Sequence, residues 1–437
     1  MVVWTRRQLA GLAGAAGVIN FAQGSPVQAP PRLSQLVGPP RLAPSWVAVG
    51  QKVLALGSNS DGGGTNTTSR QQFGILNTGS DITSIRVAFP NWKLNGGAAE
   101  SPGNNSIQIC AAIMFPFSSY YRLTFSGLPS IQLPAGATVW SDPVPVYVPK
   151  GTRFYIRSFC SVLAGQSWPR GVVPVVANGD QSEEGLGLTD NTLGGTYSGT
   201  NGACYGPCAV VGMTATPTAS VLLLTDSLGW GQGDDPSGIS STPTGDGNGN
   251  YGPFQRAFFN AGIGFVKMTK SGLYARDVVG QNIRTRLFAP YCGSAVVILG
   301  TNDLTGNQPL SAIQAALREI WGSLAAQGCR VFACTVPPKT NSTDGWMSLG
   351  NQSMPSANYG APGGGLGSVR AQLNDWLRSG PSSTVFGVLE CADPVEAGRN
   401  SGIWRPGYTN DGTHWNQVGM TAVLDVVNNA ILGGFFV

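Results

Sequence analysis

The sequence predicts an α/β domain with a doubly wound parallel sheet, a three-layer αβα arrangement, preceded by an antiparallel β-sandwich. Over residues 47–217, apolar and polar residues alternate in short runs, which is typical of strands with one buried face. Over residues 218–437, continuous apolar runs of strand length alternate with segments of helical periodicity. That second pattern is typical of a parallel sheet covered by helices on both faces. The chain, at 437 residues, is long enough for both regions.

Residues 1–29 have the composition of an export signal. Arg6 and Arg7 precede a Gly/Ala-rich apolar stretch over residues 9–22, and the segment ends in the small residue Ala29. These are the parts of a secretory signal, and the paired arginines resemble the twin-arginine type used by bacteria. The apolar stretch is shorter than the roughly 20 residues that span a bilayer. We therefore expect export to the periplasm or beyond, without insertion into the membrane after the signal is removed.

A proline-rich linker is predicted over residues 30–46, and the β-sandwich is predicted over residues 47–217. The clearest alternating strands contain Ile85-Val87-Phe89, Val144-Val146-Val148 and Phe154-Ile156. Glycine- and proline-rich turns such as residues 61–64 separate these runs, as in all-β domains.

The α/β domain is predicted over residues 218–437. Strands are expected at residues 221–224, 263–268, 295–299, 330–336 and 384–389, and helices at 310–324, 369–377 and 418–432. Pro309 suits the first turn of the first of these helices, and Gly328 is expected to end it. In sheets of this kind, ligands bind outside the carboxyl ends of the strands. Reactive side chains are therefore expected at those ends.

Four groups of polar or small residues stand where strands are expected to end, or just before the last helix. Ser227 follows the first strand, Gly272 the second and Asn302 the third, and Asp411 and His414 precede the last helix. His414 is the single histidine of the chain. One histidine excludes metal sites built from several imidazoles and leaves one candidate for imidazole acid–base chemistry.

These residue types are the ones that acyl transfer requires. A serine hydroxyl needs a base such as imidazole to take its proton, and a carboxylate can hold that imidazole in the right tautomer. The oxyanion that forms needs donors, for which the candidates are the N–H groups of Ser227 and Gly272 and the side-chain amide of Asn302. Each residue alone also has an ordinary structural explanation, as a turn, a cap or a buried histidine. Their order and common placement favour the catalytic interpretation.

Together these motifs resemble the SGNH (GDSL-type) hydrolase superfamily over residues 218–437. The resemblance implies that Ser227 is the nucleophile, that His414 is the base and that Asp411 orients it. It also implies that Gly272 and Asn302, the latter within Gly-Thr-Asn-Asp, share the oxyanion hole with the Ser227 N–H. We therefore expect a hydrolase that acts without a metal or cofactor.

The chain departs from the family pattern at Thr225, where the family usually has the glycine of Gly-Asp-Ser. The bulkier threonine is expected to alter the pocket without replacing a chemical group. Residues 122–160 also resemble the β-domain that precedes the hydrolase in some exported bacterial members, although this likeness transfers no function.

Other partners and cofactors are not indicated. The net charge is +4, from 26 Lys and Arg against 22 Asp and Glu, and no polybasic run suggests a nucleic-acid partner. A G-x-G-x-x-G pattern at residues 247–252 follows a loop rather than a strand, so nucleotide binding is not expected. Export would permit disulfides among the eight cysteines, and a local bridge between Cys204 and Cys208 is the best candidate.

The sequence thus predicts a secreted serine esterase whose substrate is an O-acyl group, such as acetyl, on a carbohydrate. Export, the added β-region and four tryptophans that could stack on sugar rings motivate this substrate; these are Trp230, Trp346, Trp404 and Trp415. A hydrolase of lipids or small esters is the alternative among enzymes. The Gly-, Ser- and Asn-rich segment 339–365 argues against an apolar lipase lid. A glycan-binding protein with a vestigial hydrolase domain is the alternative from another class.

Overall fold

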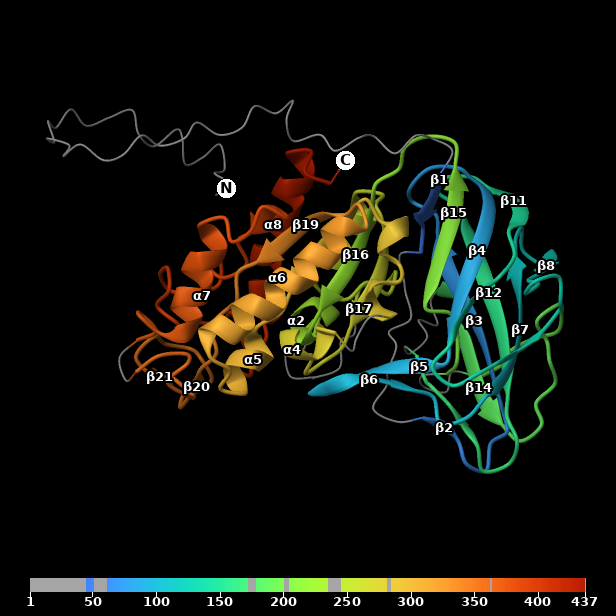
Figure 1. Cartoon of the computed structure of the whole chain (residues 1–437), viewed down its shortest axis with the longest axis horizontal. Coiled ribbons are helices and arrows are strands. Elements are labelled where there is room, and N and C mark those ends of the chain that lie inside the picture. The colour runs from blue at the N-terminus through green and yellow to red at the C-terminus, as the bar shows by residue number, and fades with distance from the viewer. Residues whose placement is uncertain are drawn as a thin grey trace, which may run out of the picture.

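The computed structural model describes residues 45–50, 61–171, 178–199, 204–234, 245–280, 284–361 and 364–436. The predicted export signal lies outside these residues, as does the predicted linker up to residue 44. Strand β1 (Ser45–Ala48) begins inside the expected linker and pairs with β15 (Ala209–Thr214). Figure 1 shows a β-rich region beside a region in which helices flank a sheet.

The first region contains two antiparallel sheets. One has the order β1-β15-β4-β10, with β11 also paired to β4; here β4 is Ile82–Pro90, β10 is Thr138–Trp140 and β11 is Val144–Val148. The other sheet has the order β14-β3-β12-β7-β8, with β9 also paired to β7. Its strands are β14 (Gln181–Gly185), β3 (Thr68–Leu76), β12 (Arg153–Ser161), β7 (Ile107–Met114), β8 (Tyr120–Arg122) and β9 (Ile131–Leu133). Two short ladders accompany them: β2 (Gly62–Gly63) with β13 (Ser167–Trp168), and β5 (Trp92–Asn95) with β6 (Ala98–Pro102).

The predicted alternation of buried and exposed residues is present in these strands. In β11 the burial alternates strictly, with the three valines buried and Pro145 and Tyr147 exposed. Side chains from both sheets, among them Val87, Ile109 and Phe154, meet in one hydrophobic cluster. Burial of this shared apolar face holds the two sheets together.

The second region contains a parallel sheet of the order β17-β16-β18-β19-β22. The strands are β16 (Ser220–Thr225), β17 (Gly264–Thr269), β18 (Ser294–Ile298), β19 (Arg330–Cys334) and β22 (Val385–Leu389), and every pairing among them is parallel. Every residue of β16, β17 and β18 is buried. This confirms the predicted α/β class with a parallel sheet.

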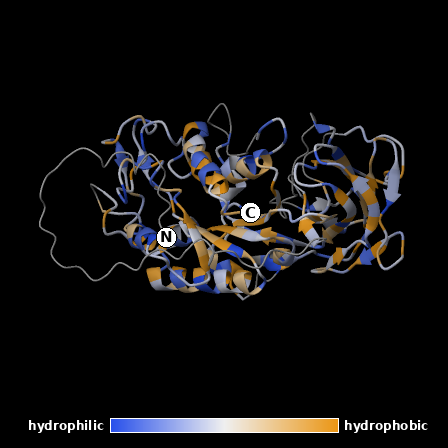
Figure 2. Ribbon diagram, turned by 90° about the horizontal axis from the view of Figure 1, so that it is seen from above, coloured by the Kyte–Doolittle hydropathy of each residue, from blue (hydrophilic) through white to orange (hydrophobic). Residues whose placement is uncertain are grey.

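Helices cover both faces of this sheet. Leu222 and Leu224 of β16 belong to one apolar cluster with α4 (Ala275–Val278), α6 (Leu310–Ala326) and α7 (Val369–Arg378). Val221 and Leu223 belong to another with α2 (Ser227–Trp230), α3 (Gly252–Asn260) and α8 (Gln417–Leu432). Figure 2 shows the hydrophobic strands between the two helical layers.

The three long helices and five strands lie close to their predicted positions. Pro309 is the N-cap of α6, and Gly328, with φ +89°, follows its end. The short helices α2, α4 and α5 (Thr301–Thr305) and the longer α3 were not predicted. Segments of four or five residues are too short to show a helical period, and the N-cap residue of α3, Tyr251, offers no side-chain cap.

The strand order reverses between β16 and β18. The chain passes from β16 through α3 to β17 on one side, and then returns to β18 on the other side of β16. Connections on opposite faces diverge at this reversal, and ligands bind there in sheets of this kind. Ser227 follows β16 and Asn302 follows β18, so both residues stand at this point.

The two regions share part of their core. Ala48, Ala88 and Trp92 of the antiparallel region belong to the same apolar cluster as the inner face of α6. Trp140 of β10 packs on Tyr291 of the 3₁₀ helix η5 (Ala289–Tyr291), with ring centroids 4.9 Å apart. The antiparallel region is therefore packed against the parallel-sheet region rather than tethered to it.

None of the eight cysteines forms a disulfide in this structure, so the bridge suggested for Cys204 and Cys208 is absent. Different backbone partners hold the two residues. The Cys204 carbonyl accepts from the Gly171 N–H, whereas the Cys208 N–H donates to Ala88 of β4.

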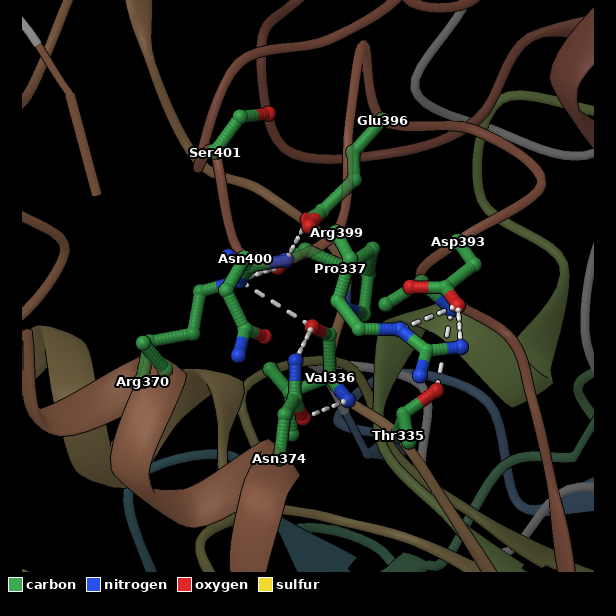
Figure 3. Close-up of polar contacts among 12 residues, drawn as sticks. Thr335, Val336, Pro337, Arg370, Asn374, Asp393, Glu396, Arg399, Asn400 and Ser401 are labelled. Atoms are coloured by element: carbon green, nitrogen blue, oxygen red, sulfur yellow. Dashed lines mark hydrogen bonds and ion pairs between the residues drawn. The ribbon is translucent and has the colours of Figure 1, made fainter. Parts of the chain in front are cut away.

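A buried ion pair fixes the carboxyl end of β19 (Figure 3). Arg370 of α7 pairs with Glu396, and neither side chain is exposed. Nε of Arg370 also donates to the carbonyls of Val336 and Pro337, at 3.1 and 2.9 Å. Asn374 accepts from the Val336 N–H at 2.8 Å and donates to its carbonyl at 2.9 Å. These bonds hold the segment after β19 against α7.

Replacing Glu396 by glutamine should destabilise the fold, because it leaves the Arg370 guanidinium buried without its counter-charge. Loss of one partner of a buried pair costs about 3–5 kcal/mol, so we expect urea unfolding of E396Q to show a loss of that size. Asp375→Asn is the control, since it removes a 63% exposed carboxylate from the same helix and should cost under about 1 kcal/mol. Equal losses in both variants would contradict this role.

Candidate active site

Ser227 is the first residue of α2, directly after β16. Asp226 caps this helix, since its Oδ1 accepts from the Leu228 N–H at 2.9 Å. The helix ends at its C-cap, Gly231, which has φ +91°. The short helix therefore turns the chain sharply at the end of a buried strand, and it holds the serine at the edge of the sheet.

Asp411 and His414 lie on the loop before α8. The Thr409 hydroxyl bridges two positions of this loop. It donates to the His414 carbonyl at 2.7 Å and accepts from the Gly412 N–H at 3.0 Å. Gly412 has φ +72°, and a Cβ there would lie 2.0 Å from the Thr340 carbonyl oxygen. The loop is thus a tight turn that projects the carboxylate and the imidazole to the same side.

The structure brings the three predicted catalytic side chains together. Nε2 of His414 lies 2.8 Å from Oγ of Ser227. Nδ1 of His414 lies 2.6 Å from Oδ2 of Asp411. The Asp411 carboxylate accepts a hydrogen bond from Nδ1–H of His414, so the unprotonated Nε2 accepts the hydrogen bond from the serine hydroxyl. This is the hydrogen-bond order of a serine nucleophile, its base and the acid that orients the base.

The environment keeps Asp411 ionised. Burial raises the pKa of Asp411, but hydrogen bonds from the His414 ring and from the N–H groups of His414 and Thr413 outweigh it and bring the pKa to about 2. Both N–H groups donate to Oδ1 at 2.8 Å. This leaves Oδ2 for the imidazole, so the backbone itself aims the carboxylate.

The predicted oxyanion donors lie on segments that contact the carboxyl end of β16. The N–H groups of Ser227 and Gly272 donate to no acceptor within the described part of the chain. Gly272 has φ +79° and lies on the loop after β17, whose Lys270 N–H donates to the Thr225 carbonyl at 3.2 Å. Nδ2 of Asn302 donates to the Leu273 carbonyl at 3.1 Å, and it is 3.4 Å from Oδ2 of Asp226. The contact with Asp226 is the longer and weaker of the two, so it is the one that an oxyanion would replace.

Two carboxylates fix the positions of these loops. Neither was predicted as a site residue. Asp303 accepts from the Ala275 N–H at 2.8 Å, which ties the Gly272 loop to α5. Asp234, fully buried, accepts from Arg256 of α3, from the Gly252 N–H and from Gln417 of α8. Asp303 stands in the Gly-Thr-Asn-Asp motif, which was a usable signal. Asp234 had none, because its partners are distant in sequence.

Thr225 lies on the buried side of the turn that carries the nucleophile. Its side chain is fully buried and packs against Gly229 of α2, where a Cβ would lie 2.2 Å from the threonine Oγ1. The larger residue is accommodated because glycine stands at position 229. The departure from the family pattern is therefore absorbed on the buried side of the turn.

Two of the four tryptophans cannot stack on a sugar. Trp404 and Trp415 are fully buried, and Nε1 of Trp404 donates to the Gly412 carbonyl at 3.0 Å, so this ring supports the catalytic loop. Trp230 and Trp346 are partly exposed. Their indole rings remain candidates for contact with substrate.

Among the described residues, no group of three or more His, Cys, Asp or Glu side chains is arranged to hold a metal ion. No helix in the described ranges has the length and apolarity needed to cross a membrane.

Comparisons with known proteins give similarities to solved structures alone. No protein-family model matches the sequence, and no curated protein matches it. A GDSL-like lipase from Bacteroides thetaiotaomicron is 14% identical, with a TM-score of 0.36, covering 49% of this chain and 89% of the other. Est24, a carbohydrate acetylesterase from Sinorhizobium meliloti, is 17% identical, with a TM-score of 0.33, covering 50% of this chain and all of the other.

One similarity extends over both regions. A family two carbohydrate esterase from Clostridium thermocellum, solved in complex with cellohexaose, is 13% identical with a TM-score of 0.35 and covers 90% of this chain and 99% of the other.

The buried carboxyl before the nucleophile should make stability depend on pH. Burial raises the pKa of Asp226 to about 7, and the neighbouring Asp303 charge adds to this effect. In the unfolded chain an aspartate titrates near about 3.9. The stabilisation from this group is therefore complete below about pH 4 and is lost as the pH rises towards 7.

Asp226→Asn removes this titration and retains a cap acceptor at Oδ1. Urea unfolding at pH 5 and pH 8 should show a smaller decline of stability with pH in D226N than in the parent chain. The comparison uses the decline within each chain, because the amide also changes the contact with Asn302. The same decline in both chains would show that Asp226 does not cause it.

Proposed function

We propose that this chain is an exported serine esterase of the SGNH type that hydrolyses carboxylic esters through an acyl-enzyme. The single observation that carries the proposal is the pair of hydrogen bonds at 2.8 and 2.6 Å, from Ser227 through His414 to Asp411. Ser227 is the nucleophile, His414 the base and Asp411 the residue that orients it.

The first half of the reaction transfers the acyl group to the enzyme. Oγ of Ser227 attacks the ester carbonyl carbon while Nε2 of His414 takes the hydroxyl proton. The carbonyl oxygen becomes an oxyanion, for which the N–H groups of Ser227 and Gly272 and the amide of Asn302 are the donors. The C–O bond to the alcohol then breaks, and His414 gives the proton to the departing oxygen.

Water completes the cycle. It attacks the acyl carbon as His414 takes one of its protons, and a second oxyanion occupies the same donors. The bond to Oγ breaks, the proton returns to Ser227, and the carboxylic acid leaves. Each proton transfer uses the one imidazole of the chain, and Asp411 stabilises the imidazolium formed in both halves.

For the substrate we propose O-acyl groups, such as acetyl, on carbohydrate. The partly exposed rings of Trp230 and Trp346 and the polar character of segment 339–365 support this choice. A hydrolase of lipids or small esters is the alternative within enzymes. A glycan-binding protein is the second alternative, but binding alone would not require the aligned hydroxyl, imidazole and carboxylate.

We further propose that residues 1–29 direct export by a twin-arginine route. In this proposal, residues 47–217 form a β-sandwich domain that serves the hydrolase domain at residues 218–437. The shared core that contains Trp92 and the inner face of α6 supports a working unit of both regions.

A fluorophosphonate probe tests the nucleophile. We expect labelling of the purified protein at Ser227 and hydrolysis of p-nitrophenyl acetate, with both lost in Ser227→Ala. Ser348→Ala, which changes a serine of segment 339–365, should label and react like the parent. No label and no turnover in the parent would favour the glycan-binding alternative. The substrate class follows from acetate released from a panel of acetylated polysaccharides, compared with turnover of long-chain esters.

Asp411→Asn should lower kcat by on the order of 10³- to 10⁴-fold, because an amide Nδ2 facing Nδ1 favours the tautomer in which Nε2 carries the proton. Asp425→Asn, an exposed acid on α8, is the control and should leave kcat unchanged. Measured rates for p-nitrophenyl acetate give both values, and a D411N rate equal to that of the control would contradict the orienting role.

The pH dependence should show a fall in kcat/KM on acidification. The pKa of Asp411 near 2 keeps it charged above about pH 4, whereas burial raises the pKa of Asp226 to about 7. The profile is therefore measured in the parent and in D226N, and a fall that persists in D226N arises from protonation of the base. The imidazolium cannot accept the serine proton. A flat profile from pH 5 to 8 would contradict the role of the imidazole.

A further inference from the structure

The β5–β6 hairpin reaches from the antiparallel region to the candidate active site. In Figure 1 it extends away from its own sheets towards α4, and β6 lies against that helix. Its turn is formed by Gly96 and Gly97, between Asn95 and Ala98. The loop that this turn meets is the one that carries the oxyanion donor Gly272.

The turn contacts both peptide groups that flank Gly272. The Gly97 N–H donates to the Gly272 carbonyl at 2.8 Å. Gly96 lies so close to the Ser271 carbonyl that a Cβ on it would come within 2.2 Å of that oxygen. The carbonyl of Ser271 and the N–H of Gly272 belong to one planar trans peptide, so they point in opposite directions. With its carbonyl against the hairpin, the peptide presents its N–H on the other side.

Gly272 needs this external support. A glycine with φ +79° has no Cβ to bias its dihedral angles, so other orientations of its peptides are accessible. Rotation of the 271–272 peptide would turn the N–H away from the oxyanion and present a carbonyl in its place. On the far side of the loop, Asp303 holds the Ala275 N–H. The hairpin and Asp303 therefore fix the loop from both ends.

The hairpin is itself anchored to both regions. Glu100 of β6 has no exposed side-chain surface and pairs with Nη1 of Arg284 at 2.9 Å. Nε of Arg284 donates to the Gly136 carbonyl at 2.9 Å. At the base of the hairpin, Nε1 of the buried Trp92 donates to Oγ1 of Thr138 at 2.7 Å. A turn held at such points has little freedom to move away from Gly272.

We infer that the Gly96–Gly97 turn is a positioning element for the oxyanion hole, so that the antiparallel region completes the catalytic apparatus of the neighbouring region. This inference rests on the proposed esterase function and assigns a role within it. Gly96 and Gly97 are positioning residues, because they act on the substrate through the peptide of Gly272.

Gly96→Ala tests the inference, since the added methyl must push the hairpin and the Ser271 carbonyl apart. We expect kcat/KM for p-nitrophenyl acetate to fall by on the order of 10²-fold, as when an oxyanion donor is lost, with KM little changed. The inhibition constant of phenylboronic acid, which becomes tetrahedral on the serine, should rise by a similar factor. Thermal unfolding of the same samples measures the folded fraction.

Gly127→Ala is the matched control. Gly127 is also a turn glycine of the antiparallel region, with φ +81° and open space around its Cα, so alanine there adds backbone strain without contact to the site. Its kcat/KM and boronate inhibition should equal those of the parent. Should G96A fail to fold, Glu100→Gln is measured in the same way, and we expect a loss of several-fold in kcat/KM with a parallel rise in the inhibition constant.

The outcomes separate the two proposals. If the parent and G127A neither hydrolyse the ester nor take the fluorophosphonate label, the esterase function fails. If both are active and the folded hairpin variant matches them in kcat/KM and boronate binding, the positioning role is overturned. A loss explained entirely by a smaller folded fraction, with unchanged boronate inhibition, would also overturn it.

Discussion

The hydrogen bond between Nε2 of His414 and Oγ of Ser227 joins residues that are 187 positions apart, and the remainder of the site is arranged around it. It can form because Ser227 follows β16 at the point where the strand order reverses, and because α8 packs on the same face as α2 and α3. The buried carboxylate of Asp234 connects α3 and α8. Alignment of the reactive atoms is thus a property of the helical layer as well as of the loops.

Two carboxylates near the serine have opposite electrostatic environments. Asp411 receives hydrogen bonds from two backbone N–H groups and an imidazole, which lower its pKa. Asp226 is enclosed in the fold and lies near Asp303, and its pKa is raised. Carboxyl groups whose environments shift their pKa values in opposite directions take different roles in a site. The ionised group supports the base, and the buried group caps the helix that carries the nucleophile.

The antiparallel region is continuous with the site rather than peripheral to it. Ala48, Ala88 and Trp92 join the apolar core of the α/β region, and the turn at Gly96 and Gly97 contacts the peptides around Gly272. A rigid hairpin suits this task, because oxyanion stabilisation depends on donors that are oriented before the reaction begins.

The sequence by itself determined the parallel-sheet class and the candidate residues Ser227, Gly272, Asn302, Asp411 and His414. It could do so because buried strands appear as continuous apolar runs, and because their carboxyl ends meet at one edge. Only the tertiary structure decided which distant segments touch. The contact of Gly96 with Ser271, the burial of Trp404 and Trp415, and the separate partners of Cys204 and Cys208 leave no periodic signal. A periodic pattern shows only which residues of one segment face the core, whereas these contacts depend on packing between segments that are remote in sequence.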